Sequence, residues 1–260
     1  MRILAIGDVV GKPGRRAVAA LLPALRADLR IDAVIANGEN AAAGRGLTGK
    51  TAEELFAAGV DVITSGNHIW DQSEIVGHLE RDARIVRPAN YPEGVPGRGM
   101  TSLPGVTVIN LMGRTFMYEI DDPFRTADRL LAEAPGDRPI VVDMHGEATS
   151  EKTAMGWHLD GRVAAVLGTH THVPTADQRV LPQGTAFVCD LGMCGTRDSI
   201  IGVEVAQVLR NFLTGMPAKF TVADNGGPVT FNAVLVDIDD TTRRARSIER
   251  VDREWEPHGQ

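Results

Sequence analysis

Five short apolar runs along this chain end in or beside a glycine, and each is followed by an acid, an amide or a histidine. The runs and their polar ends are Ile3 to Gly7 with Asp8, Val34 to Gly38 with Glu39 and Asn40, Val62 to Gly66 with Asn67 and His68, Ile140 to Met144 with His145, and Val163 to Gly168 with His170 and His172. Apolar runs are typical of buried parallel strands, and α/β sheets place ligands at the carboxyl ends of their strands. We therefore expect the five polar ends to converge on one spot.

The remaining pattern predicts a parallel sheet wound with crossover helices, because helix-like apolar spacing alternates with strand-like runs. The predicted helices cover residues 18–29, 51–58, 71–79, 123–132, 151–159 and 205–212. Pro23 should kink or interrupt the first of them. Further strands are expected at 84–86, 106–111 and 186–188, and the proline- and glycine-rich residues 87–100 predict a loop. Alternating polarity over 230–238 indicates antiparallel strands, so the sheet should be mixed or doubled.

Length and composition favour one α/β domain that works on small molecules. The chain has 260 residues, and single α/β domains often reach about 200–250 residues. Its net charge of −7 argues against a broad surface for duplex nucleic acid. The sequence contains neither an apolar run of about 18 residues nor a secretory leader, so we expect no membrane partner and a cytoplasmic location. Its cysteines, Cys189 and Cys194, are expected to be buried thiols rather than a disulfide.

The side chains at the five strand ends are better suited to holding metal ions than to packing a core. They comprise two carboxylates, two carboxamides and four imidazoles. Asp8 alone would serve equally well as a helix N-cap, and it is the other four ends that favour a ligand. The glycines at 11 and 14 lack the order of a P-loop or of a dinucleotide-binding turn.

Each polar end indicates a different task. The glycine before Glu39 allows close backbone approach, so this carboxylate can bridge two cations, with the Asn40 oxygen beside it. Asn67 would ligate through oxygen, which leaves His68 available for proton transfer. His170 and His172 are two residues apart, and on an extended segment both rings would project to the same side. The histidines outside this set, which we interpret as structural, are His78, His158 and His258.

The order of these motifs resembles the calcineurin-like metallophosphoesterases, whose signature runs GD, GD, GNH, H, GHxH. This chain differs from the common form at Val10, where a histidine would stand, and at Glu39-Asn40, which replace the second aspartate. Both departures are typical of the YmdB-like branch. The resemblance covers essentially the whole chain.

This resemblance implies a fold and a ligand set. The fold would be an α/β metallophosphoesterase-type sandwich of two mixed β-sheets flanked by helices, as a single domain over residues 1–260. One metal would be held by Asp8, Glu39, Asn40 and His172, and the other by Glu39, Asn67, His145 and His170. Glu39 would bridge the two ions, and His68 would donate the proton. The ions would be divalent or mixed-valence, iron or manganese first and zinc as the alternative.

The implied activity is hydrolysis of cyclic nucleotides, with 2′,3′-cyclic nucleotides favoured. A hydroxide shared by the two ions would attack phosphorus while His68 protonates the departing ribose oxygen. Arg45 and Arg197 are candidate phosphate contacts, although solvent-facing surface is the favoured interpretation of both. We also expect a homo-oligomer, with residues 87–100 and 193–208 as candidate contact segments.

Two other functions remain open from the sequence. The same centre would serve a phosphomonoesterase or protein phosphatase, which activity on mono- and diesters would separate. A regulatory scaffold that keeps the metals for folding and binds RNA-processing partners would instead tolerate the loss of His68.

Overall fold

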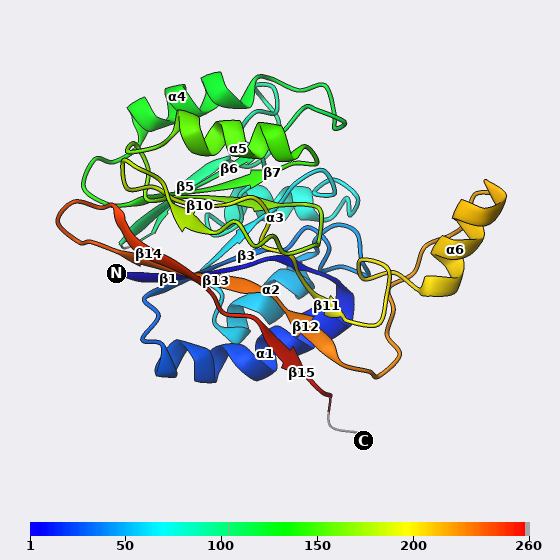
Figure 1. The fold of residues 1–260 in the computed structure, drawn as a ribbon. Coiled ribbons are helices and arrows are strands. Elements are labelled where there is room, and N and C mark those ends of the chain that lie inside the picture. The colour runs from blue at the N-terminus through cyan, green and yellow to red at the C-terminus, as the bar shows by residue number, and fades with distance from the viewer. Residues whose placement is uncertain (104, 258–260) are drawn as a thin grey trace.

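Two β-sheets pack face to face in the computed structural model, which describes residues 1–103 and 105–257 (Figure 1). The first sheet has the strand order β14-β13-β1-β3-β4. Its parallel strands are β1 (Arg2–Ile6), β3 (Ala33–Asn37) and β4 (Val62–Thr64), and its antiparallel strands are β13 (Ala233–Ile238) and β14 (Ala245–Arg250). The antiparallel C-terminal strands expected from the alternation over 230–238 are therefore present.

The second sheet is also mixed and has the order β5-β6-β7-β8-β10-β9. Its strands are β5 (Met100–Leu103), β6 (Val106–Met112), β7 (Ile140–His145), β8 (Ala165–Thr169), β9 (Arg179–Val180) and β10 (Ala186–Val188). The strands β6, β7, β8 and β10 run parallel, whereas β5 and β9 close the two edges in the antiparallel direction.

The two sheets are held together by a core of aliphatic side chains. Ile3 and Val62 of the first sheet belong to the same buried cluster as Val108, Val141 and Leu167 of the second. Removing one such side chain from water stabilises the fold by about 1.5–3 kcal/mol. This core explains why the strands read as continuous apolar runs, since both faces of each sheet are covered.

Helices cover the outer faces of the sandwich (Figure 1). The outer face of the first sheet packs with α1 (Gly11–Asp28), α2 (Gly49–Ala58) and α3 (Ile75–Arg81), and that of the second with α4 (Pro123–Glu133) and α5 (Thr149–His158). A further helix, α6 (Val205–Thr214), stands away from the body. No helix among the described residues is long and apolar enough to cross a membrane.

A third, smaller sheet extends the predicted pair within the described part of the chain. It has the order β15-β12-β11-β2 and consists of β2 (Asp8–Val9), β11 (Met193–Thr196), β12 (Val229–Phe231) and β15 (Arg253–Trp255). Asp8 leaves β1 and enters this sheet at once, because β2 pairs with β11 in parallel. The metallophosphoesterase-type sandwich is confirmed, with this sheet as an addition.

Two of the predicted helices differ from the structure. The helix α1 is continuous from Gly11 to Asp28 with Pro23 inside it, so the expected interruption is wrong. The third helix begins at Ile75 rather than at Asp71, because residues 71–74 form turns and the Asp71 carboxylate contacts His68 instead. Residues 84–86 contribute only an isolated bridge at Ile85, whereas the loop expected at 87–100 is present up to β5.

Strand register aligns the carboxyl ends of neighbouring strands within each sheet, and a contact of 3.3 Å from Asn37 Nδ2 to Asp143 Oδ2 joins the two sheets at these ends. Asn37 at the end of β3 lies opposite Thr64 at the end of β4. In the second sheet, His145 at the end of β7 lies opposite Thr169 at the end of β8. The loops that leave these strands therefore emerge at one edge of the sandwich, where we place the candidate site.

Candidate metal centre

The five polar strand ends meet at this edge of the sandwich. Asp8 follows β1, Glu39 and Asn40 follow β3, and Asn67 and His68 follow β4. From the second sheet come His145, the last residue of β7, and the loop after β8 with His170 and His172. Each is in direct contact with another member of the set, and the contacts fall into two groups that share Glu39.

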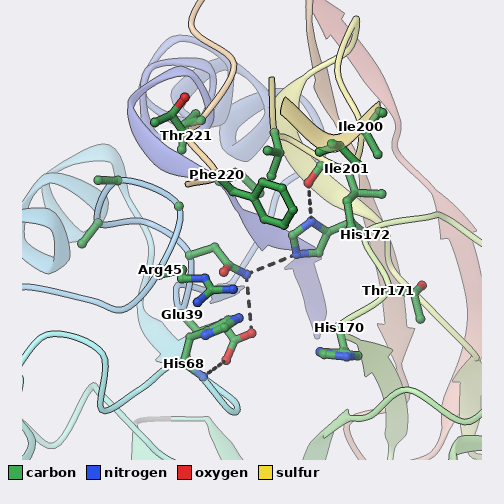
Figure 2. A pocket seen from close by; sticks show the side chains of 18 of the residues that line it. Glu39, Arg45, His68, His170, Thr171, His172, Ile200, Ile201, Phe220 and Thr221 are labelled. Carbon is green, nitrogen blue, oxygen red and sulfur yellow. Dashed lines mark hydrogen bonds between the residues drawn. The ribbon is translucent and has the colours of Figure 1, made fainter. Parts of the chain in front are cut away.

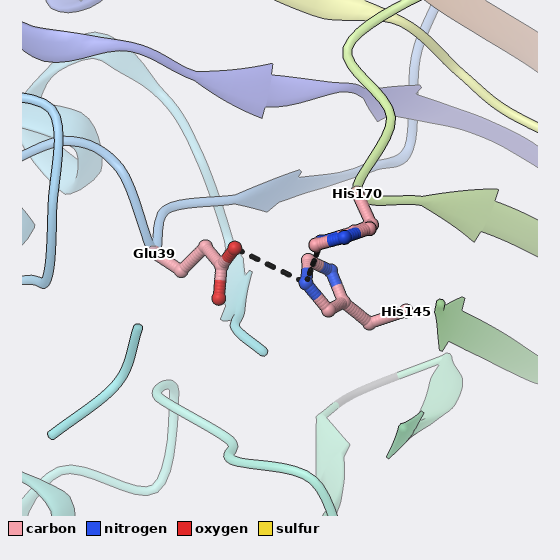
Figure 3. A group of neighbouring side chains, drawn as sticks. All are labelled: Glu39, His145 and His170. Carbon is pink, nitrogen blue, oxygen red and sulfur yellow. Dashed lines mark hydrogen bonds and ion pairs between the residues drawn. The ribbon is translucent and has the colours of Figure 1, made fainter. Parts of the chain in front are cut away.

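The first group surrounds Nε2 of His145. This atom lies 2.9 Å from Asn67 Oδ1, 3.1 Å from Glu39 Oε1 and 3.1 Å from His170 Nδ1. Figure 3 shows Glu39 and His170 turned toward the His145 ring, and one ligand atom from each of the three lies within 4.8 Å of the others. A single N–H cannot serve three such neighbours, whereas a cation accepts lone pairs from all of them.

Buried hydrogen bonds below the site set the orientation of His145. Its Nδ1 lies 2.9 Å from the Thr169 hydroxyl, which donates to Asp143 at 2.6 Å. Because that hydroxyl has one proton and gives it to Asp143, it accepts from Nδ1–H, and Nε2 faces the cluster. Histidine ligands of metals are usually held through their second nitrogen in this way. The sequence analysis missed Asp143, which also contacts Asn37 and Thr64 and so ties the two sheets together.

The second group surrounds His172. Its Nε2 lies 3.2 Å from Asn40 Nδ2 and 3.8 Å from Asp8 Oδ1, while Nδ1 donates to the Ile201 carbonyl at 2.8 Å. Asn40 Nδ2 in turn lies 3.5 Å from Glu39 Oε1. The Asn40 amide has its nitrogen toward the ring, and a half-turn of the amide would offer its oxygen as a ligand instead.

The geometric reason given for the His170 and His172 pair is wrong. The segment is not extended, since His170 has φ 104° and His172 has φ 64°. Both residues adopt the left-handed region that side chains rarely occupy, and such backbone persists where the surroundings demand it. As a result the two rings enter different groups: His170 joins His145, and His172 joins Asn40 and Asp8.

Asp8 shows that the centre suits a cation. The side chain is fully buried, and its Oδ1 has no hydrogen-bond partner within residues 1–103 and 105–257. Burial raises the pKa of the Asp8 carboxyl to about 7, against the lowering effect of His172 and His145. An unpaired buried carboxylate is costly, and a metal ion supplies the charge that compensates it. The donor set of carboxylate, amide and imidazole groups fits a first-row metal.

The other buried groups of the centre shift one another's pKa through their charges. Burial by itself would raise the pKa of Glu39, yet the charge of His145 and the hydrogen bond to it lower that pKa to about 2. For His145, burial favours the neutral ring, but the facing Glu39 outweighs it and raises the pKa to about 9. Burial and then the nearby His145 lower the pKa of His170 to about 3. The carboxylates thus stabilise positive charge in the middle of the cluster.

His68 lies beside both groups without its ring joining them. Its backbone N–H donates to Glu39 Oε2 at 2.9 Å, and its ring Nδ1 lies 2.9 Å from Asp71 Oδ2. A carboxylate can only accept, so Nδ1 carries a proton and Nε2 is available to the cavity. The sequence pattern placed Asp71 at the start of a helix. Its spacing of three residues after His68 was the signal that could have identified it as a partner.

Gly66 lets the strand ends approach each other closely. A Cβ atom at this position would lie 2.2 Å from the ring of His145, well inside contact distance. The glycine that precedes Asn67 and His68 is therefore required by the contact between the two sheets rather than by backbone conformation.

A buried ion pair supports the loop that carries His170 and His172. Lys152 and Asp190, both 1% exposed, are joined by a bond of 2.8 Å from Nζ to Oδ2. Asp190 also accepts from the backbone of Thr171 at 3.1 Å and of Gly192 at 2.9 Å, and Lys152 donates to the Thr169 carbonyl at 3.4 Å. The sequence analysis missed this pair, because nothing in the local pattern joins residues 38 positions apart.

We expect Lys152→Met to lower the free energy of unfolding by about 3–5 kcal/mol, because it leaves the buried Asp190 carboxylate without its cation. Urea unfolding followed by tryptophan fluorescence, with a chelator present, would measure this. The exposed Lys50→Met on α2 is the matched control and should change stability by less than about 0.5 kcal/mol. A loss below about 1 kcal/mol for Lys152→Met would show that the pair is not structural.

A cavity of about 590 Å³ opens directly onto the centre (Figure 2). Glu39, Asn40, His68, His170 and His172 form part of its wall. Of the two arginines considered as phosphate contacts, Arg45 lines this cavity. Arg197 does not belong to the wall and instead pairs with Asp198 and Glu254. Glu147, which the sequence analysis missed, also lines the cavity and lies 3.1 Å from His170.

The remaining sequence-based assignments are consistent with this placement. His78 and His158 lie outside the cavity wall, the second beside Asp128 at 3.0 Å. His258 lies outside the described residues. Cys189 and Cys194 are buried and form no disulfide in the described part of the chain, as expected.

Comparison with known proteins places these observations in a family. The family model described as "YmdB-like protein" matches residues 4–251. The chain is 50% identical to a Bacillus subtilis protein named 2′,3′-cyclic-nucleotide 2′-phosphodiesterase, over 96% of each chain. A crystal structure of a hypothetical protein from Thermus thermophilus is 48% identical with a TM-score of 0.92, covering 99% of this chain and 100% of that one. A crystal structure described as a novel phosphatase from Mycoplasma pneumoniae is 33% identical with a TM-score of 0.91, covering 99% and 95%.

Proposed function

The chain belongs to the YmdB-like family, and from that premise we propose that it is a metal-dependent phosphodiesterase that hydrolyses 2′,3′-cyclic nucleotides. The observation that carries the proposal is the meeting of two carboxylates, two carboxamides and three histidines around the shared Glu39. The name of the Bacillus subtilis relative supports the substrate class.

Each group of side chains would hold one ion. Asp8, Asn40 and His172 would bind the first and Asn67, His145 and His170 the second, with Glu39 shared between them. Bound divalent cations supply Lewis-acid activation of water and stabilise negative charge on the phosphoryl oxygens. Iron or manganese agrees with the mixed nitrogen and oxygen donors, and zinc is the alternative.

His68 would act as the proton donor. Its ring lies against the cavity, and the Asp71 carboxylate accepts a hydrogen bond from Nδ1 and so fixes the orientation of the ring. As the oxygen of water bonds to phosphorus and the bond from phosphorus to one ribose oxygen breaks, Nε2–H would deliver its proton to that ribose oxygen. The proton that the attacking water loses returns to His68 through solvent, so one water is consumed and the product is a nucleoside monophosphate.

Arg45 is suited to orient the phosphate. It is an exposed residue in a loop of small residues, lines the cavity and makes no ion pair within the described residues. A guanidinium can bind two phosphoryl oxygens at once, which would hold the diester against the centre.

A substrate panel would test the proposal. Chelator-treated protein should be inactive on 2′,3′-cyclic AMP, and added Mn²⁺ or Fe²⁺ should restore release of adenosine monophosphate, measured by chromatography. Activity should be lower on 3′,5′-cyclic AMP, on p-nitrophenyl phosphate and on a phosphopeptide. Preference for p-nitrophenyl phosphate over its bis ester would favour the phosphomonoesterase alternative, in line with the description of the Mycoplasma pneumoniae relative as a phosphatase.

A further inference from the structure

The cavity beside the centre has two ends of opposite character. Its polar end consists of Glu39, His68, His170 and His172 together with Arg45. Its other end is apolar and is lined by Ile201, Val203, Val208, Phe212, Phe220 and Val222. A nucleotide has the same asymmetry, since a charged phosphate lies at one end and a flat, largely apolar base at the other.

The apolar end is formed by residues 200–223, which we term the α6 arm. The two sides of the arm are joined by a bridge between Val203 and Val222 and by a backbone bond from Glu204 to Thr221 of 3.0 Å. Gln207 and Thr221 also bond reciprocally, with Nε2 donating to Oγ1 at 2.7 Å and the Thr221 N–H donating to Oε1 at 2.8 Å. These bonds hold the residue just before Thr221, which is Phe220, in a defined place.

Phe220 presents open aromatic surface to the cavity. Phe220 is 43% exposed, whereas Val208, on the wall of the same cavity, is 6% exposed. Figure 2 shows Phe220 and His172 on the wall of one cavity. Ligand sites typically combine apolar and aromatic lining with a few convergent polar groups.

The arm and the centre are physically connected. The Ile201 carbonyl accepts the hydrogen bond from His172 Nδ1, and Ile201 itself has φ 47°, a strained conformation for a β-branched residue. A Cβ atom at Gly44 would lie 2.6 Å from Val222, so the loop that bears Arg45 also packs on the arm. The spacing between the polar end and Phe220 is thus set by direct contacts.

We propose that the α6 arm is the nucleobase subsite and that Phe220 is its stacking face. This inference rests on the proposed function and adds the substrate determinant to it. Two side-chain amides at the cavity already donate to backbone carbonyls, Gln72 to Arg45 at 3.0 Å and Asn211 to Met216 at 2.9 Å. Stacking on an aromatic ring tolerates any base, so the subsite should discriminate weakly among the four bases.

The test compares a nucleotide with a base-free analogue. The value of kcat/KM is measured for 2′,3′-cyclic AMP and for 1-O-methylribose 2′,3′-cyclic phosphate. Phe220→Ala should lower the ratio of kcat/KM for the nucleotide to kcat/KM for the base-free analogue by about tenfold to a hundredfold. This factor corresponds to the free energy of stacking one base on an aromatic ring. Phe220→Tyr, which keeps the ring, should restore most of the ratio. Leu213→Ala is the control, because this side chain lies on α6 at 82% exposure but does not line the cavity.

Other results of this comparison separate failure of the nucleobase subsite from failure of the phosphodiesterase proposal. An unchanged ratio with active protein overturns the nucleobase subsite and leaves the phosphodiesterase proposal standing. An equal loss on both substrates, accompanied by a change of oligomeric mass in light scattering, also overturns it and assigns Phe220 to subunit contact. If the wild-type protein hydrolyses neither compound, the proposed function fails. In that case adenosine binding, measured by saturation-transfer NMR, tests whether the nucleobase subsite exists. Equal binding by the wild type and Phe220→Ala overturns the subsite.

Discussion

Replacement of His68 by alanine is expected to lower kcat on 2′,3′-cyclic AMP by about 10²- to 10⁴-fold, the usual contribution of a positioned proton donor. The metal content should stay at the wild-type level, because the contact from residue 68 to Glu39 comes from the backbone N–H, which alanine retains. Steady-state kinetics and elemental analysis of the same preparation measure the two quantities.

The matched control for this prediction is His78→Ala, which removes a histidine that does not line the cavity. Asp71→Asn should give a smaller loss of kcat than His68→Ala, since the ring of His68 remains and the amide oxygen can still accept from Nδ1. If kcat of His68→Ala falls by less than about threefold, proton donation by this residue is wrong. A regulatory effect that survives the loss of turnover would favour the scaffold function.

Glu39→Gln is expected to weaken binding of both ions and to reduce activity by at least about a hundredfold. This loss is larger than the usual loss when a residue that only hydrogen-bonds a metal ligand is replaced. The physical reason is position: Glu39 lies 3.1 Å from His145 in one group and 3.5 Å from Asn40 in the other. An amide keeps the shape but removes the negative charge between the two sites. Metal stoichiometry after dialysis, measured by elemental analysis, checks the prediction.

Asp8→Asn sharpens the comparison, because Asp8 contacts His172 and the backbone of His170 but does not enter the group around the ring of His145. This variant should lose one ion per chain where Glu39→Gln loses both. Glu249→Gln, on the exposed face of β14, is the neutral control and should bind metal as the wild type does. Full metal content in Glu39→Gln would contradict a shared carboxylate.

The assignments that depended on strand ends were accessible from sequence because they are local. A buried parallel strand requires an apolar run, and the residue after it must lie at the carboxyl edge of the sheet. On that basis the sequence placed four polar residues at this edge: Asp8, Glu39, Asn67 and His145. The antiparallel C-terminal strands were predicted correctly from alternating polarity, which is also local, whereas the metallophosphoesterase-type sandwich was implied by the resemblance of the motifs to that family.

Other features required three-dimensional packing. The left-handed backbone at His170 and His172 depends on contacts with Asp8 and Ile201, so the local pattern suggested an extended segment instead. A propensity for local structure yields when a tertiary contact is stronger.

The sequence by itself determined which chemical groups stand at the strand ends and in what order, because spacing and residue type are properties of the chain. The tertiary structure alone decided which groups lie together, which arginine lines the cavity, and that Lys152 and Asp190 support the histidine loop. It also placed the apolar α6 arm against the centre. These are contacts between residues distant in sequence, and their energies depend on burial and distance, which no local pattern encodes.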